Sequence, residues 1–229
     1  MNVIKLIVKY KKTGYMKYLS HLEMVNLIER ILRRVKVPFE FSEGYNPKPQ
    51  ISFAAPLAVG VISQAEYFDV KIKKKFDLDR IINIDKSYLP EGIEFIDAKF
   101  TKKTKSIMAL VKSADYILKT ELKDDVDKDY LKSKLSDFLN EDEIIWTKIR
   151  KKKKPIDKDI LKLINKFSVL HKNNNEVFFS INAKTGSSGN LKPEVALNKF
   201  LEYIPLEKKE DYIVIERKEI YKENFDSII

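Results

Sequence analysis

The stretch Phe41-Ser-Glu-Gly-Tyr-Asn-Pro-Lys-Pro-Gln-Ile-Ser-Phe53 decides how the first half of this chain folds. Four turn-forming residues separate the apolar runs 37–41 and 51–55, namely Gly44, Asn46, Pro47 and Pro49. They predict a stiff turn between two extended segments. The same loop carries groups that can bind a ligand: Ser42, Tyr45, Asn46 and Lys48. A simple connector does not need this mixture, so we interpret the loop as a binding surface, with a turn in which Pro and Gly only fix the strand geometry as the alternative.

The segments on either side of this loop predict the order β-α-β-β-α-β. Strands are expected at 2–11, 37–41, 66–72 and 92–102, and helices at 20–36 and shortly after Asp77. Ser20 and Glu23 form a capping box at the start of the first helix, and Pro38 ends it. This order is typical of the ferredoxin-like motif, a four-stranded antiparallel sheet with two helices on one face.

The second half repeats a similar order after a polar segment at 101–106. Strands are expected at 114–122, 144–150, 176–183 and 212–221, helices at 127–139 and from Pro193 onward, and 160–170 is ambiguous. The helix at 127–139 is expected to bury Tyr130, Leu131, Leu135, Phe138 and Leu139. The predicted fold class is therefore α+β, with two tandem ferredoxin-like domains at 1–103 and 107–229.

Composition indicates a folded, basic protein. Of 229 residues, 44% are hydrophobic and 34% are charged, which is enough apolar material for a core. Lys and Arg number 44 against 34 Asp and Glu, a net charge of +10. This balance favours an anionic partner such as RNA, DNA or an acidic protein. A lysine-rich surface that serves only solubility is the alternative.

Several kinds of site are excluded or not expected. The chain has no Cys and 2 His, so it cannot hold a disulfide, a thiolate nucleophile or a Cys-ligated cluster. We expect neither a metal nor a cofactor. No apolar run approaches the ~20 residues of a membrane span. The first ten residues resemble a strand rather than a signal peptide, so a cytoplasmic location is expected.

Three further features could carry chemistry. His21, at the start of the first helix, is a candidate general base or phosphate ligand, or it completes a turn. The helix also carries Arg30 and Arg33 ahead of the loop.

A basic run contains Lys148, Arg150, Lys151, Lys152, Lys153 and Lys154. It predicts phosphate contacts, with a solvated loop as the alternative. The glycine-rich turn from Lys184 to Pro193, which includes Lys192, could cradle a phosphate, or its glycines only shape the turn.

The sequence is similar to the bacterial family of radical-SAM-linked proteins, a domain of unknown function. The resemblance is carried by 18–23, 38–49, 52–60 and 63–66, and more weakly by 151–157 and 189–193. It implies association with a radical SAM enzyme but no established catalytic residues. Without Cys, this chain is not expected to be the radical SAM component itself. The positions of this chain that match the motifs of the family are Ser20, His21, Ser42, Gly44, Asn46, Pro47, Pro49, Ser52, Pro56, Gly60 and Glu66.

We therefore expect a non-catalytic accessory module that binds RNA or a ribonucleoprotein through a basic cleft, beside a radical SAM partner. The candidate binding residues are Arg30, Arg33, Ser42, Tyr45, Asn46, Lys48, Arg150, Lys151, Lys152, Lys153, Lys154, Lys184 and Lys192. Two alternatives stay open: an RNA-processing or RNA-modifying enzyme that uses His21, and a protein–protein adaptor for the radical SAM partner. The substrate and the oligomeric state are not determined by the sequence.

Overall fold

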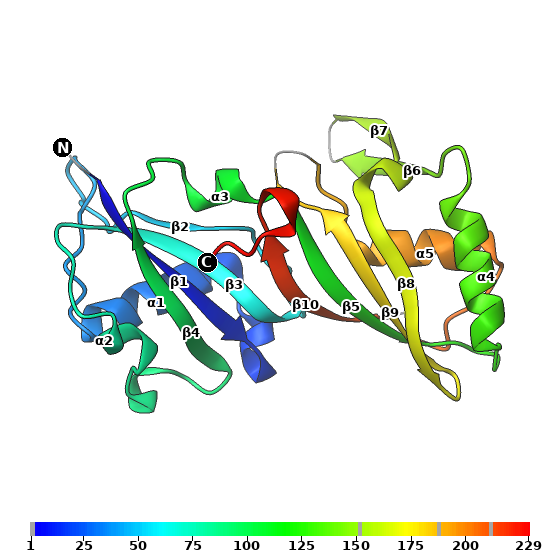
Figure 1. Ribbon diagram of the computed structural model, residues 1–229, viewed down its shortest axis with the longest axis horizontal. Helices are drawn as coiled ribbons and strands as arrows, with labels where there is room; N and C mark the ends of the chain where they lie inside the picture. The colour runs from blue at the N-terminus through cyan, green and yellow to red at the C-terminus, as the bar shows by residue number, and fades with distance from the viewer. Residues whose placement is uncertain (1–2, 151–152, 187–188, 211–212) are drawn as a thin grey trace. The chain divides into compact units, whose positions relative to one another are not determined.

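The computed structural model describes residues 3–150, 153–186, 189–210 and 213–229. It is a mixed α+β structure with largely antiparallel strands, which confirms the predicted class (Figure 1). The chain forms two compact units. The first unit is Met1–Lys112 with Arg217–Ile229, and the second unit is Ser113–Glu216. The predicted domains, 1–103 and 107–229, differ from these units in two segments, because 107–112 and 217–229 belong to the first unit.

The first unit is built on strands in the order β4-β1-β3-β10, and β2 also pairs with β3. The strands are β1 (Ile4–Lys12), β2 (Ile51–Phe53), β3 (Ile62–Ile72), β4 (Ile93–Thr101) and β10 (Val214–Tyr221), of which the part from Arg217 belongs to this unit. β1 is antiparallel to both neighbours, with Val8 opposite Phe68 and Ala98. The helices are α1 (His21–Arg34), α2 (Asp79–Ile82), α3 (Ile107–Leu110) and the 3-10 turns η1 (Gly14–Tyr18), η2 (Lys86–Tyr88) and η4 (Glu223–Phe225).

α1 begins where the sequence predicts and covers one face of this sheet (Figure 1). The capping box is confirmed: the Ser20 amide donates to Glu23 Oε2 at 2.7 Å, and the Glu23 amide donates to Ser20 Oγ at 3.4 Å. Hydrogen bonding of the Glu23 carboxylate to the side chain and the amide of Ser20 lowers the pKa of Glu23. The buried face of α1 packs into a core shared with the strands, which includes Ile28, Ile31, Leu32, Leu6, Val8, Phe68, Val70 and Phe95.

The predicted strand at 37–41 is wrong. Only isolated bridges form there, Phe39 with Ile72 and Phe41 with Pro49, and the strand of this region is β2. Pro38 has no amide hydrogen to donate to a ladder, and Phe41 pairs with the far end of its own loop. The short helix α3, capped by Ser106, was not predicted.

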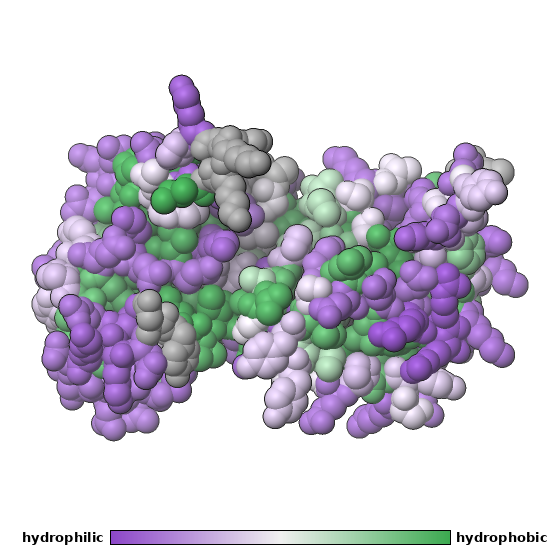
Figure 2. Space-filling view, turned by 180° about the vertical axis from the view of Figure 1, so that it is seen from behind, coloured by the Kyte–Doolittle hydropathy of each residue, from purple (hydrophilic) through white to green (hydrophobic). Residues whose placement is uncertain are grey.

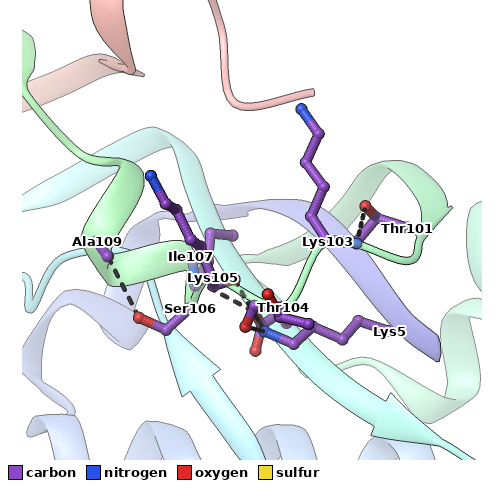
Figure 3. A network of polar contacts seen from close by, with 9 residues as sticks. Lys5, Thr101, Lys103, Thr104, Lys105, Ser106, Ile107 and Ala109 are labelled. Carbon is purple, nitrogen blue, oxygen red and sulfur yellow. Dashed lines mark hydrogen bonds and ion pairs between the residues drawn. The ribbon is translucent and has the colours of Figure 1, made fainter. Parts of the chain in front are cut away.

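A buried ion pair fixes the segment that follows β4 (Figure 3). Lys5 Nζ lies 3.0 Å from Asp69 Oδ2 and also donates to the carbonyl oxygens of Thr104 and Lys105 at 3.3 and 3.0 Å. The Ile107 amide donates to Asp69 Oδ2 at 3.1 Å. Both charges of the pair are therefore compensated by partners. The polar stretch predicted as a boundary is held against β1 and β3.

The second unit contains strands in the order β5-β9-β8 and a separate hairpin of β6 and β7. The strands are β5 (Ser113–Glu121), β6 (Ile145–Arg150), β7 (Lys153–Asp159), β8 (Ile164–Asn173) and β9 (Glu176–Lys184), and the helices are α4 (Lys128–Leu139), α5 (Pro193–Tyr203) and the 3-10 turn η3 (Leu161–Leu163). The ambiguous run 160–170 becomes η3 and the first part of β8. β7 was not predicted, because Lys and Asp along it hide any apolar alternation.

The core of the second unit lies between α5, α4 and the sheet. The rings of Phe179 and Phe200 are 6.1 Å apart, and those of Phe138 and Phe200 are 5.6 Å apart. Leu131 and Leu135 of α4 are buried as predicted. Tyr130 is not, since 43% of it is exposed; it lies at the edge of the apolar face of α4, where its hydroxyl reaches water.

Candidate binding surface

The loop Ser42–Lys48 is closed at its base by its own first and last residues. The Ser42 amide donates to the Lys48 carbonyl oxygen at 2.9 Å, and the Lys48 amide donates to Ser42 Oγ at 3.1 Å. Gly44 takes φ = +113°, a conformation that side-chain-bearing residues rarely adopt. The loop is therefore a preorganised projection of the first unit, as the turn residues predicted.

The tip of this loop presents an aromatic ring to solvent. Tyr45 has a relative exposure of 109%, so both faces of its ring are accessible. Asn46 and Lys48 are exposed beside it. The arrangement offers a stacking surface, an amide and an ammonium group on one short segment.

Arg33 supports the base of the loop from α1. Its guanidinium carbon lies 5.6 Å from the ring centroids of both Phe39 and Phe41. It also pairs with Glu29, with 2.7 Å between Nη2 and Oε1. Arg33 thus positions the loop while its side chain stays half exposed.

Arg30 also lies on α1. It is exposed and lines a pocket of 620 Å³ with Met16, Leu19, Glu23, Asn26, Leu27, Glu29 and Pro90. Arg30 and Arg33 are neighbours on the surface of α1, and Glu29, the ion-pair partner of Arg33, also lines this pocket.

His21 is exposed at the start of α1, and its ring meets the edge of Phe53 with centroids 5.2 Å apart. The neighbouring Ser20 and Glu23 are engaged with each other in the capping box. The contact with Phe53 is a packing role that the sequence did not indicate.

A buried charged cluster lies beneath the loop 54–60. Arg217 Nη1 is 2.9 Å from Glu66 Oε1, and Lys12 Nζ donates to the Leu19 carbonyl oxygen at 2.8 Å. Burial lowers the pKa of Lys12, and the nearby Arg217 lowers it further against the opposing effect of Glu66. The pKa of Tyr10 is raised well above its ordinary value, mainly by burial and to a smaller extent by the charge of Glu66.

This cluster holds the loop 54–60 in place. Arg217 donates to the carbonyl oxygens of Ala55 and Pro56 at 3.5 and 3.2 Å, and the Gly60 amide donates to the Lys17 carbonyl oxygen at 2.9 Å. Four large apolar or aromatic side chains of the surrounding segments are exposed: Tyr15, Tyr18, Leu22 and Val59. Sequence reasoning marked Glu66 but missed Lys12 and Arg217, which looked like ordinary surface cations of strands.

The basic run falls on the hairpin of β6 and β7 in the second unit. Arg150 pairs with Lys153 in the register of this hairpin, and Lys148 and Lys154 are exposed. Lys151 and Lys152 lie outside the described residues.

The glycine-rich turn leads from β9 into α5. The Leu191 amide donates to the Lys184 carbonyl oxygen at 3.1 Å. Gly189 takes φ = +144°, a conformation that side-chain-bearing residues rarely adopt, so the backbone favours glycine there. Lys192 precedes α5 and pairs with Glu194 at 3.8 Å. Ser187 and Ser188 of this turn lie outside the described residues.

Over the described part of the chain, no group of three or more His, Asp or Glu is arranged to hold a metal ion, and no helix is long and apolar enough to cross a membrane. Figure 2 shows hydrophilic residues spread over the visible face of each unit, with hydrophobic residues between them.

Comparisons with known proteins place the chain in a family and give its fold relatives. A family profile described as "Uncharacterized protein conserved in bacteria (DUF2344)" matches residues 5–193. No curated protein matches the sequence.

Two solved structures resemble the fold. "Crystal Structure of a Cbf5-Nop10-Gar1 Complex" matches with a TM-score of 0.54 and 15% identity, over 96% of this chain and 50% of that one. "Structure of H/ACA RNP bound to a substrate RNA containing 2'-deoxyuridine" matches with a TM-score of 0.51 and 15% identity, over 96% of this chain and 49% of that one. The chain thus spans about half the length of these structures, and at this identity the likeness concerns the fold alone.

Proposed function

We propose that this chain is a non-catalytic module that binds single-stranded RNA or a ribonucleoprotein. The chain belongs to the bacterial family DUF2344, whose members are uncharacterized. The observation that carries the proposal is the closed loop Ser42–Lys48, with Tyr45 fully exposed at its tip. An aromatic ring on a preorganised loop can stack on a base without first losing loop entropy.

Charge supports the same ligand. Lys48 is exposed next to Tyr45, and the chain carries a net charge of +10, so phosphate groups are attracted to the site. One of the two fold relatives comes from the structure of an H/ACA RNP bound to a substrate RNA. In the first unit, the order β4-β1-β3 with β2 on β3 supports a ferredoxin-like scaffold behind the loop.

The test uses the full chain and a labelled single-stranded RNA in a fluorescence anisotropy titration. Tyr45→Ala is expected to weaken binding about tenfold, within the range of one lost stacking contact, while Tyr45→Phe keeps the affinity. Tyr88→Ala is the matched control, because Tyr88 is exposed in the same unit but outside the loop. Absence of salt-dependent RNA binding near physiological ionic strength overturns the proposal.

A second candidate function is a protein adaptor, with a radical SAM enzyme as the partner suggested by the sequence resemblance. The exposed Tyr18, Leu22 and Val59 favour it, because large apolar side chains around one loop are typical of protein contacts. Leu22→Glu is expected to abolish co-purification with such a partner without changing RNA affinity. If Leu22→Glu lost both co-purification with the partner and RNA affinity, the two ligands would not bind to separate surfaces.

A further inference from the structure

In the part of the chain that the structure describes, helices cover one face of the sheet of the second unit, and the other face carries none. α5 crosses the far side of β8 and β9 in Figure 1, and α4 packs beside β8. Phe179 points to the covered side, where its ring contacts Phe200 and Phe167. Because side chains alternate along a strand, Phe178 and Ser180 point to the opposite face.

On that opposite face, three neighbouring strands bring an aromatic row together. Phe178 of β9 lies opposite Lys119 of β5 and His171 of β8. The rings of His171 and Phe178 are stacked, with centroids 4.0 Å apart and planes at 17°. Lys119 Nζ lies 5.7 Å from the centroid of the Phe178 ring. His171 is exposed and Phe178 is half buried, so the stacked pair reaches the surface.

The next row of the same face adds small polar groups. Ser180 lies opposite Ser168 of β8 and Ile117 of β5, and all three are partly exposed. Hydroxyl groups beside a stacked aromatic pair can accept from or donate to the edge of a base.

Charge on this face is compatible with a polyanion. Three carboxylates lie on this face and each has a partner: Glu176 pairs with Lys119, Glu121 pairs with Lys209, and Asp115 accepts from the Asn182 side-chain amide at 2.6 Å. Strand alternation also places Lys184 on this face. Across the described ranges, neither Lys184 nor the exposed Lys166 forms an ion pair, which leaves their ammonium groups available to phosphates.

We propose that the row His171–Phe178–Lys119 is a base-stacking site for single-stranded RNA, separate from the Ser42–Lys48 loop. A base extends the existing stack over the exposed imidazole, Ser180 and Ser168 contact its edge, and Lys166 and Lys184 attract the flanking phosphates. The inference takes its ligand, single-stranded RNA, from the proposed function. It adds a second site, which contacts bases by stacking.

The experiment compares two probes on the full chain by fluorescence anisotropy: a single-stranded oligouridylate and an oligomer of equal length that lacks bases. His171→Ala is expected to weaken binding of oligouridylate about fivefold or more, as for one lost stacking contact, and to leave the abasic oligomer unaffected. Phe178→Leu keeps an apolar side chain and is expected to have the same effect. Leu170→Ala is the matched control, since Leu170 is exposed on the same strand beside His171.

Photocrosslinking of oligouridylate followed by peptide mapping gives a second readout, with a crosslink expected in the segment 164–184. Unchanged affinity of both variants together with weakened binding by Tyr45→Ala overturns this inference and leaves the proposed function standing. Weakened binding by His171→Ala with unchanged binding by Tyr45→Ala supports the inference and overturns the loop as the RNA site. If the parent protein binds neither probe, both proposals fail. Equal losses for oligouridylate and the abasic oligomer also overturn the stacking site.

Discussion

Arg217 and Glu66 form a buried ion pair, with 2.9 Å between Nη1 and Oε1, although 151 positions separate them in the sequence. The pair joins β10 to β3 and, through the carbonyl oxygens of Ala55 and Pro56, also fixes the loop 54–60. The C-terminal segment from Arg217 is therefore part of the first unit, next to Ala55, Pro56 and Glu66.

Breaking this pair is expected to destabilise the first unit strongly. Arg217→Ala leaves the Glu66 carboxylate buried without its partner, which costs about 3–5 kcal/mol. Urea unfolding measures the loss. Lys11→Ala is the control, because it removes the exposed Lys11–Glu94 pair and should cost less than about 1 kcal/mol. Equal losses for the two variants would contradict the role assigned to burial.

Gly92 and Gly60 have the same backbone conformation but different space for a side chain, so substituting each by Ala measures the cost of a steric clash. Both have φ = +90°, but a Cβ at Gly92 would lie 2.4 Å from the Thr13 carbonyl oxygen, whereas no atom lies within 4 Å of one at Gly60. Both substitutions by Ala carry backbone strain of roughly 1–3 kcal/mol. Gly92→Ala should cost about 1–3 kcal/mol more because of the clash. Similar unfolding midpoints for the two variants would show that Thr13 moves aside.

Asp69 is expected to control the order of the segment 104–107. Asp69→Asn removes the charge that compensates buried Lys5 and weakens the acceptor of the Ile107 amide. We expect hydrogen exchange of the Ile107 amide to accelerate about tenfold or more. Asp97→Asn is the control, since Asp97 is an exposed carboxylate of β4. Unchanged exchange in Asp69→Asn would contradict the network in Figure 3.

Alkaline pH is expected to destabilise the protein through Tyr10 and Tyr67. Burial raises the pKa of both hydroxyls above 10.0, and for Tyr67 the hydrogen bond to Glu219 raises it further. The folded state therefore keeps protons that the unfolded state releases, so stability present below about pH 10 is lost as the pH rises above it. In urea unfolding across this range, a Tyr10→Phe/Tyr67→Phe variant should lose stability less steeply than the parent. Parallel pH profiles would show that other groups dominate.

Local signals made several elements predictable. The Ser20–Glu23 capping box sets the start of α1, and turn residues define the loop Ser42–Lys48, because each depends on groups a few residues apart. The local pattern failed to predict the structure of segments whose conformation depends on strand pairing. The segment 37–41 looked like a strand but pairs at isolated points, and β7 looked like a charged loop but is a strand opposite β6.

The candidate sites divide in the same way. Tyr45 could be proposed from the sequence, since the turn residues around it predict a tight loop and loops lie on the surface. The stacking of His171 on Phe178 could not, because it depends on the register of β8 against β9 and on a bulge near His171.

The sequence by itself determined the α+β class, the starts of the main helices, the exposed loop with Tyr45 and the basic character of the chain, since these follow from spacing, turn chemistry and charge. Only the tertiary structure decided that Lys12, Glu66 and Arg217 are buried together, that the C-terminal strand completes the first unit, and which side chains share the open face of β5-β9-β8. Those relations join residues far apart in the chain, and only packing and strand register bring them together.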